Sequence, residues 1–106
     1  MPNKPAARLH RLDDTPREKM MERVERRFLS GERCTLAQVW LTRGAVVPSH
    51  THDSEQISYV LVIPSRVAHA AEALEDTYDL DFFAPRRDDW ISGDDAYLRG
   101  KTSARG

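Results

Sequence analysis

Three of the four histidines of this 106-residue chain lie close together in the sequence, at His50, His52 and His69. His50 and His52 are one residue apart, so on an extended strand both imidazoles project from the same face, with Cβ atoms about 6–7 Å apart. This spacing suits two ligands of one metal ion. Gln56 can offer an amide oxygen from the neighbouring strand, and His69 can close the site from a third. The alternative is a group of exposed histidines beside a turn.

Short strands are the elements that must position these side chains. Strand-forming residues dominate the chain from Phe28 onward, and Ser30-Gly31 interrupts them in a way that indicates a hairpin. Strands at intervals of about ten residues, with turns between them, are typical of an all-β barrel or sandwich. The predicted extended segments are residues 28–41, 56–63, 67–74 and 77–83.

Helical signals are few. Thr15, Pro16 and Glu18 form a capping box with proline at the first helical position, which predicts a short N-terminal helix over residues 16–23. One helical turn is expected over residues 86–91, closed by Ser92-Gly93. We expect three parts: a flexible arm over 1–14, a single domain over 15–98 and a flexible tail over 99–106.

Composition excludes several classes of protein. With 40% hydrophobic residues, 31% charged residues and a net charge of -1, the chain is an ordinary globular protein of one domain. No apolar run approaches the roughly 20 residues of a spanning helix, and no apolar stretch follows the basic N-terminus, so the predicted location is the cytoplasm. A single cysteine, Cys34, excludes an internal disulfide and a thiolate-only metal site.

Charge is distributed unevenly, with nine Lys or Arg against six acids in residues 1–33 and nine acids against two arginines in residues 72–95. The basic cluster has no interleaved aromatic residues and no nucleic-acid motif. We therefore interpret it as a solvated face and expect neither a nucleic acid nor a membrane as partner. Its members are Arg23, Arg26, Arg27 and Arg33.

Two segments resemble the cupin motifs. Residues 44–56 match the first motif: a glycine, five residues, His-x-His, then Glu or Gln three or four residues later. Residues 64–69, Pro-Ser-Arg-Val-Ala-His, resemble the Pro-x-Gly-x-x-His part of the second. The resemblance covers residues 24–99 and implies a small single-domain cupin with a jelly-roll β-barrel and a small-molecule substrate. It also implies that a divalent transition metal (Fe, Mn, Ni, Zn or Cu) is held by His50, His52, Gln56 and His69.

Residues 80–90 resemble the segment that follows the second motif in cupins of the pectin-degradation type, which open the ring of unsaturated uronic sugars. This resemblance implies that Asp81 and Phe83 line the cavity and that Arg87 binds a substrate carboxylate. A carboxylate can shuttle a proton, and a guanidinium pairs bidentately with a carboxylate. The alternatives are core packing for Phe83 and an ion pair between Arg87 and a nearby acid, at Asp88, Asp89 or around Glu75.

The chain also departs from the cupin pattern. About twenty residues between the two motifs are missing, which implies a truncated barrel with open strand edges. Arg66 replaces the motif-two glycine, where the turn demands a positive φ. A hairpin turning at residues 64–65 would place His69 opposite Val60 and misalign it with Gln56. Either the site is incomplete, or two chains pair their edges or exchange strands as a homodimer.

Two functions follow from these features. The first is a metal-dependent enzyme, a lyase or isomerase, acting on a small carboxylated or sugar-acid substrate such as an unsaturated uronate. The second is a non-catalytic truncated cupin that serves as a metal or small-molecule binding module or as an assembly module. The retained ligand set favours the first, whereas the missing hairpin and Arg66 favour the second. The predicted fold is all-β: a truncated, cupin-like jelly-roll β-barrel with a short N-terminal helix.

Overall fold

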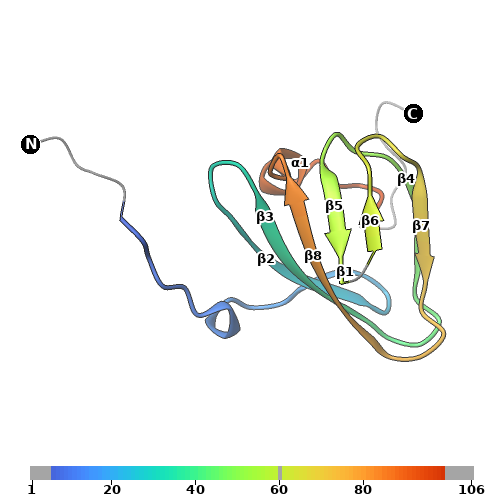
Figure 1. The fold of residues 1–106 in the computed structure, drawn as a ribbon. Coiled ribbons are helices and arrows are strands. Elements are labelled where there is room, and N and C mark those ends of the chain that lie inside the picture. The colour runs from blue at the N-terminus through green and yellow to red at the C-terminus, as the bar shows by residue number, and fades with distance from the viewer. Residues whose placement is uncertain (1–5, 60, 100–106) are drawn as a thin grey trace, which may run out of the picture.

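The computed structural model describes residues 6–59 and 61–99 and folds them mainly into β-strands (Figure 1). A six-stranded sheet has the order β1-β2-β3-β8-β5-β6, and a two-stranded sheet pairs β4 with β7. The all-β class is therefore confirmed. The strands are β1 (Glu18–Met21), β2 (Val24–Ser30), β3 (Thr35–Leu41), β4 (Val46–His50), β5 (Glu55–Ser58), β6 (Leu61–Ile63), β7 (His69–Glu72) and β8 (Thr77–Ala84).

Alternation along β3 explains why this part of the chain is a strand. Thr35, Ala37, Val39 and Leu41 are buried, and the residues between them are only partly buried, which is the period of two expected for a strand with one face on a core. β3 lies between β2 and β8, and the predicted β2–β3 hairpin is confirmed. The large sheet therefore presents the buried face of β3 and β8 toward the interior.

The predicted helix over residues 16–23 is wrong. Residues 18–21 form β1, which pairs with β2 so that Glu18 lies opposite Arg26, and Met20 is buried. A single 3-10 turn, η1 (Leu12–Asp14), comes earlier in the chain. Strand pairing and burial of Met20 outweigh the local capping signal, because helix propensity contributes only tenths of a kcal/mol per residue.

The path between the two motifs also differs from the prediction. Residues 56–63 are not one extended run, because β5 and β6 pair as a hairpin with Ser58 opposite Leu61. After β6 the chain crosses to the other sheet, where His69 on β7 lies opposite His50 on β4. The expected misalignment of the ligands is therefore wrong: the side chains are brought together within one chain, without an exchanged strand.

Arg66 has the positive φ that its position predicts, at 63°. Its backbone N–H donates to the carbonyl of His52 at 2.8 Å, and its guanidinium lies 3.2 Å from Asp53. This turn therefore ties the loop of the first motif to the loop of the second.

The last described segment packs against the hydrophobic core through Trp90 and Leu98. It contains α1 (Asp88–Ser92), which ends at Gly93 with a left-handed φ of 82°, as the sequence predicts. Asp95 is fully buried and pairs with Arg26 at 2.6 Å. The solvated-face interpretation is thus wrong for Arg26, which is buried because Asp95 neutralises it and because its guanidinium lies over the Trp90 ring at 4.3 Å.

Some expectations are untested. Residues 1–5 and 100–106, which make up most of the predicted tail and part of the predicted arm, lie outside the described residues. The division into arm, domain and tail stays a prediction. None of the described helices is long and apolar enough to cross a membrane.

Candidate metal centre

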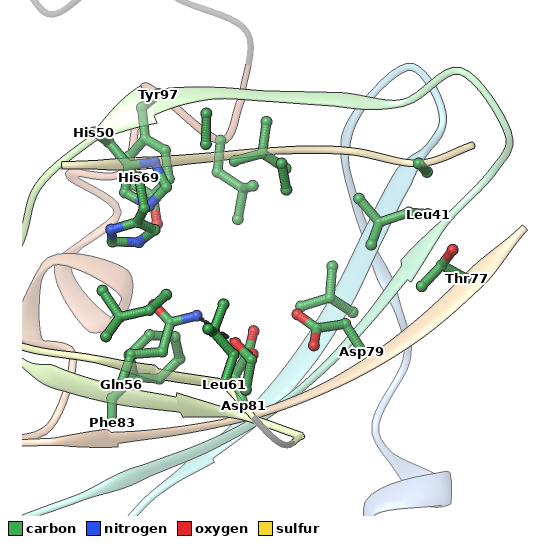
Figure 2. Close-up of a pocket in the computed structure, with 18 of the residues that line it drawn as sticks. Leu41, His50, Gln56, Leu61, His69, Thr77, Asp79, Asp81, Phe83 and Tyr97 are labelled. Carbon is green, nitrogen blue, oxygen red and sulfur yellow. Dashed lines mark hydrogen bonds between the residues drawn. The ribbon is translucent and has the colours of Figure 1, made fainter. Parts of the chain in front are cut away.

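Three of the predicted ligands, His50, Gln56 and His69, line one end of a cavity between the two sheets (Figure 2). The fourth, His52, lies beside Gln56 and His69. His50 ends β4, His69 begins β7, His52 lies in the loop after β4, and Gln56 is on β5. One ring nitrogen from each histidine lies within 4.8 Å of the others. The three imidazoles are therefore close enough to bind one ion.

Each of the three rings is oriented by a backbone carbonyl two residues away. The Nδ1 atoms of His50, His52 and His69 lie 2.8 Å from the carbonyls of Pro48, Ser54 and Val67. A carbonyl only accepts, so each Nδ1 carries the hydrogen and donates it. In the neutral ring the hydrogen-free nitrogen is then Nε2, which is the arrangement of a metal-binding histidine held by its outer hydrogen bond.

The Nε2 atoms of His52 and His69 find no hydrogen-bond donor among the described residues. The Nε2 of His52 lies 3.0 Å from the Oε1 of Gln56, and both atoms are acceptors once His52 donates from Nδ1. The Gln56 amide cannot simply be reversed, because its Nε2 donates to Ser58 Oγ at 2.8 Å. The Nε2 of His69 is buried without a hydrogen-bond partner among the described residues. A cation would satisfy all of these lone pairs, so the residues fit a metal.

Burial and neighbouring charges favour the neutral form of the His50 and His52 rings. Burial lowers the pKa of His50 to about 4; the Pro48 carbonyl opposes this, and His69, His52 and Arg87 lower the pKa further. Burial also lowers the pKa of His52, helped by the positive charge of Arg87. Neutral imidazole is the form that binds metals, because the ligand must offer a lone pair.

Asp81 and Phe83 face the cavity from β8, as the sequence predicts for two residues that lie two positions apart on a strand. Asp81 is buried, and its Oδ1 accepts from Ser58 Oγ at 2.5 Å and from Gln56 Nε2 at 3.4 Å. Phe83 is buried too, with its ring edge-on to those of His52 and Trp90. Phe83 therefore both packs in the core and lines the cavity.

Arg87 is buried at the end of the cavity where His50 and His69 lie, and it forms the ion pair with Asp89 that was the alternative expectation from the sequence; its role in binding a substrate carboxylate stays a prediction. Its Nε and Nη2 donate to the two carboxylate oxygens of Asp89 at 2.9 and 2.7 Å, and Nη2 also donates to the Tyr97 hydroxyl at 2.9 Å. Burial alone lowers the pKa of Arg87, but Asp89 and Tyr97 raise it overall. Its Nη1 is buried with no hydrogen-bond partner among the described residues, so a donor is left for a ligand.

Three cavity residues were not predicted from the sequence. Ser58 donates to Asp81, Tyr97 stacks on His50 with ring centroids 4.2 Å apart, and Asp79 faces the cavity two positions before Asp81. The alternation Asp79-x-Asp81-x-Phe83 would have identified Asp79, since alternate residues of a strand share a face. Tyr97 carried no such signal, because it lies beyond the last strand.

Replacing Asp79 with asparagine is expected to make the protein more stable than the wild type, by a difference that grows as the pH rises from about 4 to 8. Burial, and then the hydrogen bond to Asp81 and its charge, raise the pKa of Asp79 from 3.8 to about 8. Between these values the folded state binds more protons than the unfolded state, so the free energy of unfolding falls with rising pH. Asparagine does not titrate, so the free energy of unfolding of D79N does not fall for this reason.

Urea denaturation of the metal-free wild type and D79N across pH 4–8 measures the difference. Glu75→Gln, a change at an exposed acid on the β7–β8 connection, is the matched control and should shift the curve by a constant amount. Parallel pH curves for D79N and the wild type would contradict the prediction.

Comparison with known proteins supports the fold assignment. The sequence matches no protein-family model and no curated protein. Among solved structures, an RmlC-like cupin from Shewanella frigidimarina NCIMB 400 is 20% identical with a TM-score of 0.73, covering 80% of this chain and 96% of that one. KdgF from Halomonas sp. is 23% identical with a TM-score of 0.63, covering 80% of this chain and 99% of that one.

These similarities show the fold: the described part of the chain folds like the RmlC-like cupin and like KdgF, which agrees with the fold that the resemblance of its two motifs implies. The structural neighbours include KdgF, and the described chain combines the shared fold with a cluster of three histidines able to hold a metal.

Proposed function

We propose that this protein is a metal-dependent enzyme that opens the ring of an unsaturated uronate or a similar small sugar acid. The observation that carries the proposal is the convergence of three histidines beside a cavity that His50, His69, Asp81 and Arg87 line. The resemblance of residues 80–90 to cupins of the pectin-degradation type supports the substrate class.

The metal would be held by the Nε2 atoms of His50, His52 and His69 and by Oε1 of Gln56. Three imidazoles and an amide oxygen suit Fe, Mn, Ni, Zn or Cu. The chemistry that such an ion supplies is polarisation of a substrate oxygen. Gln56 is held for this role because its amide nitrogen donates to Ser58, which turns Oε1 toward His52.

Asp81 is the residue that would move a proton. Its Oδ1 is occupied by the hydroxyl of Ser58 and the amide of Gln56, so its position is fixed. The second carboxylate oxygen is the atom that would accept the proton of the anomeric hydroxyl group of the substrate. As the bond between the anomeric carbon and the ring oxygen breaks, the anomeric carbon becomes an aldehyde and the ring oxygen becomes part of an enolate, whose double-bond carbon would take the same proton back. Phe83 would exclude water beside it, since its ring is buried against His52.

Arg87 would bind the carboxylate of the substrate. Its other nitrogens are engaged by Asp89 and Tyr97, which leaves Nη1 as the available donor. Because the guanidinium is held by these contacts before the substrate arrives, little side-chain entropy is lost on binding. The substrate carboxylate would therefore lie at the metal end of the cavity.

The test is loss of ultraviolet absorbance when unsaturated galacturonate is added to protein loaded in turn with Fe, Mn, Ni, Zn or Cu. Turnover is expected with at least one metal, and Asp81→Asn should reduce it about a hundredfold without loss of the metal. Asp88→Asn, at an exposed acid paired with Arg86, is the control and should retain activity. Metal-loaded protein that shows no turnover would exclude the enzyme and favour the non-catalytic binding module.

We also propose that the protein forms a homodimer through the outer face of β5, β6 and β8. Ile57 lies between Val62 and Phe82 in register, and these three side chains are 46%, 59% and 50% exposed. β6 ends the six-stranded sheet within the described residues. An apolar patch beside an unpaired strand edge suits a second copy of the chain across a two-fold axis.

Sedimentation equilibrium should show that the wild type is a dimer and that the Phe82→Glu variant is a monomer. A monomeric wild type would contradict the proposed dimer.

A further inference from the structure

The segment that follows α1 contributes a tyrosine to the cavity at the end where His50 lies. Tyr97 lines the cavity there, and Figure 2 shows its ring beside His50. Residues on both sides of Tyr97 in the sequence anchor this segment, because Asp95 is fully buried against Arg26 and Leu98 packs in the core. The Tyr97 side chain is therefore held in the cavity lining by its own segment.

The hydroxyl group of Tyr97 accepts two hydrogen bonds. Nη2 of Arg87 donates to it at 2.9 Å, and Nε1 of Trp90 donates to it at 3.2 Å. Guanidinium and indole nitrogens only donate, so the phenol oxygen is the acceptor in both bonds and its own hydrogen is free to be donated elsewhere. Among residues 6–59 and 61–99, no acceptor for this hydrogen is found.

The stacked ring of His50 is not the missing acceptor. The two ring centroids are 4.2 Å apart, and the ring planes make an angle of only 21°. The lone pair of an imidazole nitrogen lies in the plane of its own ring, so in a stacked pair it is not directed at the hydroxyl of the other ring. Because Tyr97 lines the cavity, its hydrogen is left as a donor for a ligand there.

Arg87 makes this hydroxyl a donor suited to an anion. A phenol oxygen that accepts from a cationic guanidinium is polarised, which strengthens the bond that its own hydrogen donates. A hydrogen bond to an ionised oxygen is stronger than one to a neutral oxygen. Since Nη1 of Arg87 is the donor proposed for the substrate carboxylate, Tyr97 and Arg87 would each bind one oxygen of that carboxylate.

We propose that Tyr97 is a ligand-binding residue, whose hydroxyl group donates a hydrogen bond to a carboxylate oxygen of the ligand. The ligand class is a small sugar acid, which this contact distinguishes from a neutral sugar of the same size. The inference rests on the proposed function, because it takes the substrate carboxylate to lie beside Arg87.

Tyr97→Phe removes the hydroxyl group and keeps the ring that stacks on His50, so the affinity for the metal should not change. Titration calorimetry of the metal-loaded variant should show an affinity for galacturonate about 10–100-fold below that of the wild type, which is the range for a hydrogen bond to a charged group. Galactose has a hydroxymethyl group in place of the carboxylate, and it should bind to the wild type at least about tenfold more weakly than galacturonate.

Tyr78→Phe is the matched control, because it removes a phenol hydroxyl outside the cavity. Tyr78 lies on β8 next to the cavity-facing Asp79, is 51% exposed, and accepts a hydrogen bond from Gln38. Alternate residues of a strand face opposite sides of the sheet, so this hydroxyl is on the outer face. The Tyr78→Phe variant should retain the wild-type affinity for galacturonate.

A crystal structure of the metal-loaded wild type with galacturonate is a second measurement, which does not depend on the folding of a variant. We expect a carboxylate oxygen about 2.5–2.7 Å from the hydroxyl oxygen of Tyr97. A carboxylate more than about 3.5 Å from this atom would overturn the inference. So would wild-type affinity for galacturonate in Tyr97→Phe, or equal affinities of the wild type for galacturonate and galactose.

The outcomes also separate this inference from the proposed function. Failure of galacturonate to bind to wild type that holds a metal would overturn the role of Tyr97 and leave the metal centre intact. The predicted loss of affinity in Tyr97→Phe, without turnover of unsaturated galacturonate by the wild type, would overturn the proposed reaction and retain the role of Tyr97. Turnover by the wild type with unchanged galacturonate affinity in Tyr97→Phe would do the reverse.

Discussion

Replacing His69 with alanine is expected to lower the affinity for a divalent transition metal by about 10²–10³-fold, because structural metal sites of four ligands bind with about 10–16 kcal/mol and His69 is one of the four proposed ligands. The Nε2 of His69 is buried without a hydrogen-bond partner among the described residues, so metal binding is the role that its geometry indicates. Competition with a chromophoric chelator measures the change in affinity.

The fold should survive this substitution, because β7 pairs with β4 through backbone hydrogen bonds and His69 is only partly buried. Circular dichroism checks the fold. His10→Ala is the control, because His10 is an exposed residue before η1, and it should retain wild-type affinity. Equal affinities for His69→Ala and the wild type would show that His69 is not a ligand.

Asp95→Ala is expected to reduce the free energy of unfolding by about 3–5 kcal/mol, since removing one partner of a buried ion pair leaves the other charge uncompensated. Arg26 and Asp95 are both fully buried and lie 2.6 Å apart. Asp95 also accepts from Arg99 at 2.6 Å, so two cations lose a partner. Chemical denaturation at neutral pH measures the loss.

An exposed ion pair supplies the matched control for Asp95. Asp13→Ala removes the partner of Arg27 at 2.7 Å, but Asp13 is 84% exposed, so its loss should cost less than about 1 kcal/mol. Since Tyr97 and Leu98 lie two and three positions after Asp95 and line the cavity, the Asp95 variant should also bind metal less tightly. Losses of similar size for Asp13→Ala and Asp95→Ala would contradict the account of this ion pair.

The sequence predicts the gathering of the histidines well because the information is local. His50 and His52 are separated by one residue, and Gln56 follows on the next strand. Because these three residues are close in the sequence, local geometry is enough to predict that their side chains lie near one another. The alternating pattern of residues 35–41 similarly predicts β3. Cupin motifs add His69, whose distance in the sequence does not itself specify contact with His50.

Other features depend on tertiary contacts that no local pattern encodes. The capping signal at residues 15–18 predicts a helix, but β1 forms there because β2 offers a strand to pair with. The sequence around Arg26 is typical of an exposed arginine, because the residue that neutralises it, Asp95, lies 69 positions later in the chain. Crossing from β6 to the other sheet is what joins Gln56 and His69, whereas a simple hairpin would separate them.

Anomalous diffraction at the metal edge from crystals of the protein loaded with zinc or manganese tests the central claim most directly. We expect one peak per chain, about 2.0–2.3 Å from the Nε2 atoms of the three histidines and from Oε1 of Gln56. A peak bound to fewer than three of these imidazoles, or crystals of folded protein with no peak in the cavity, would contradict the account.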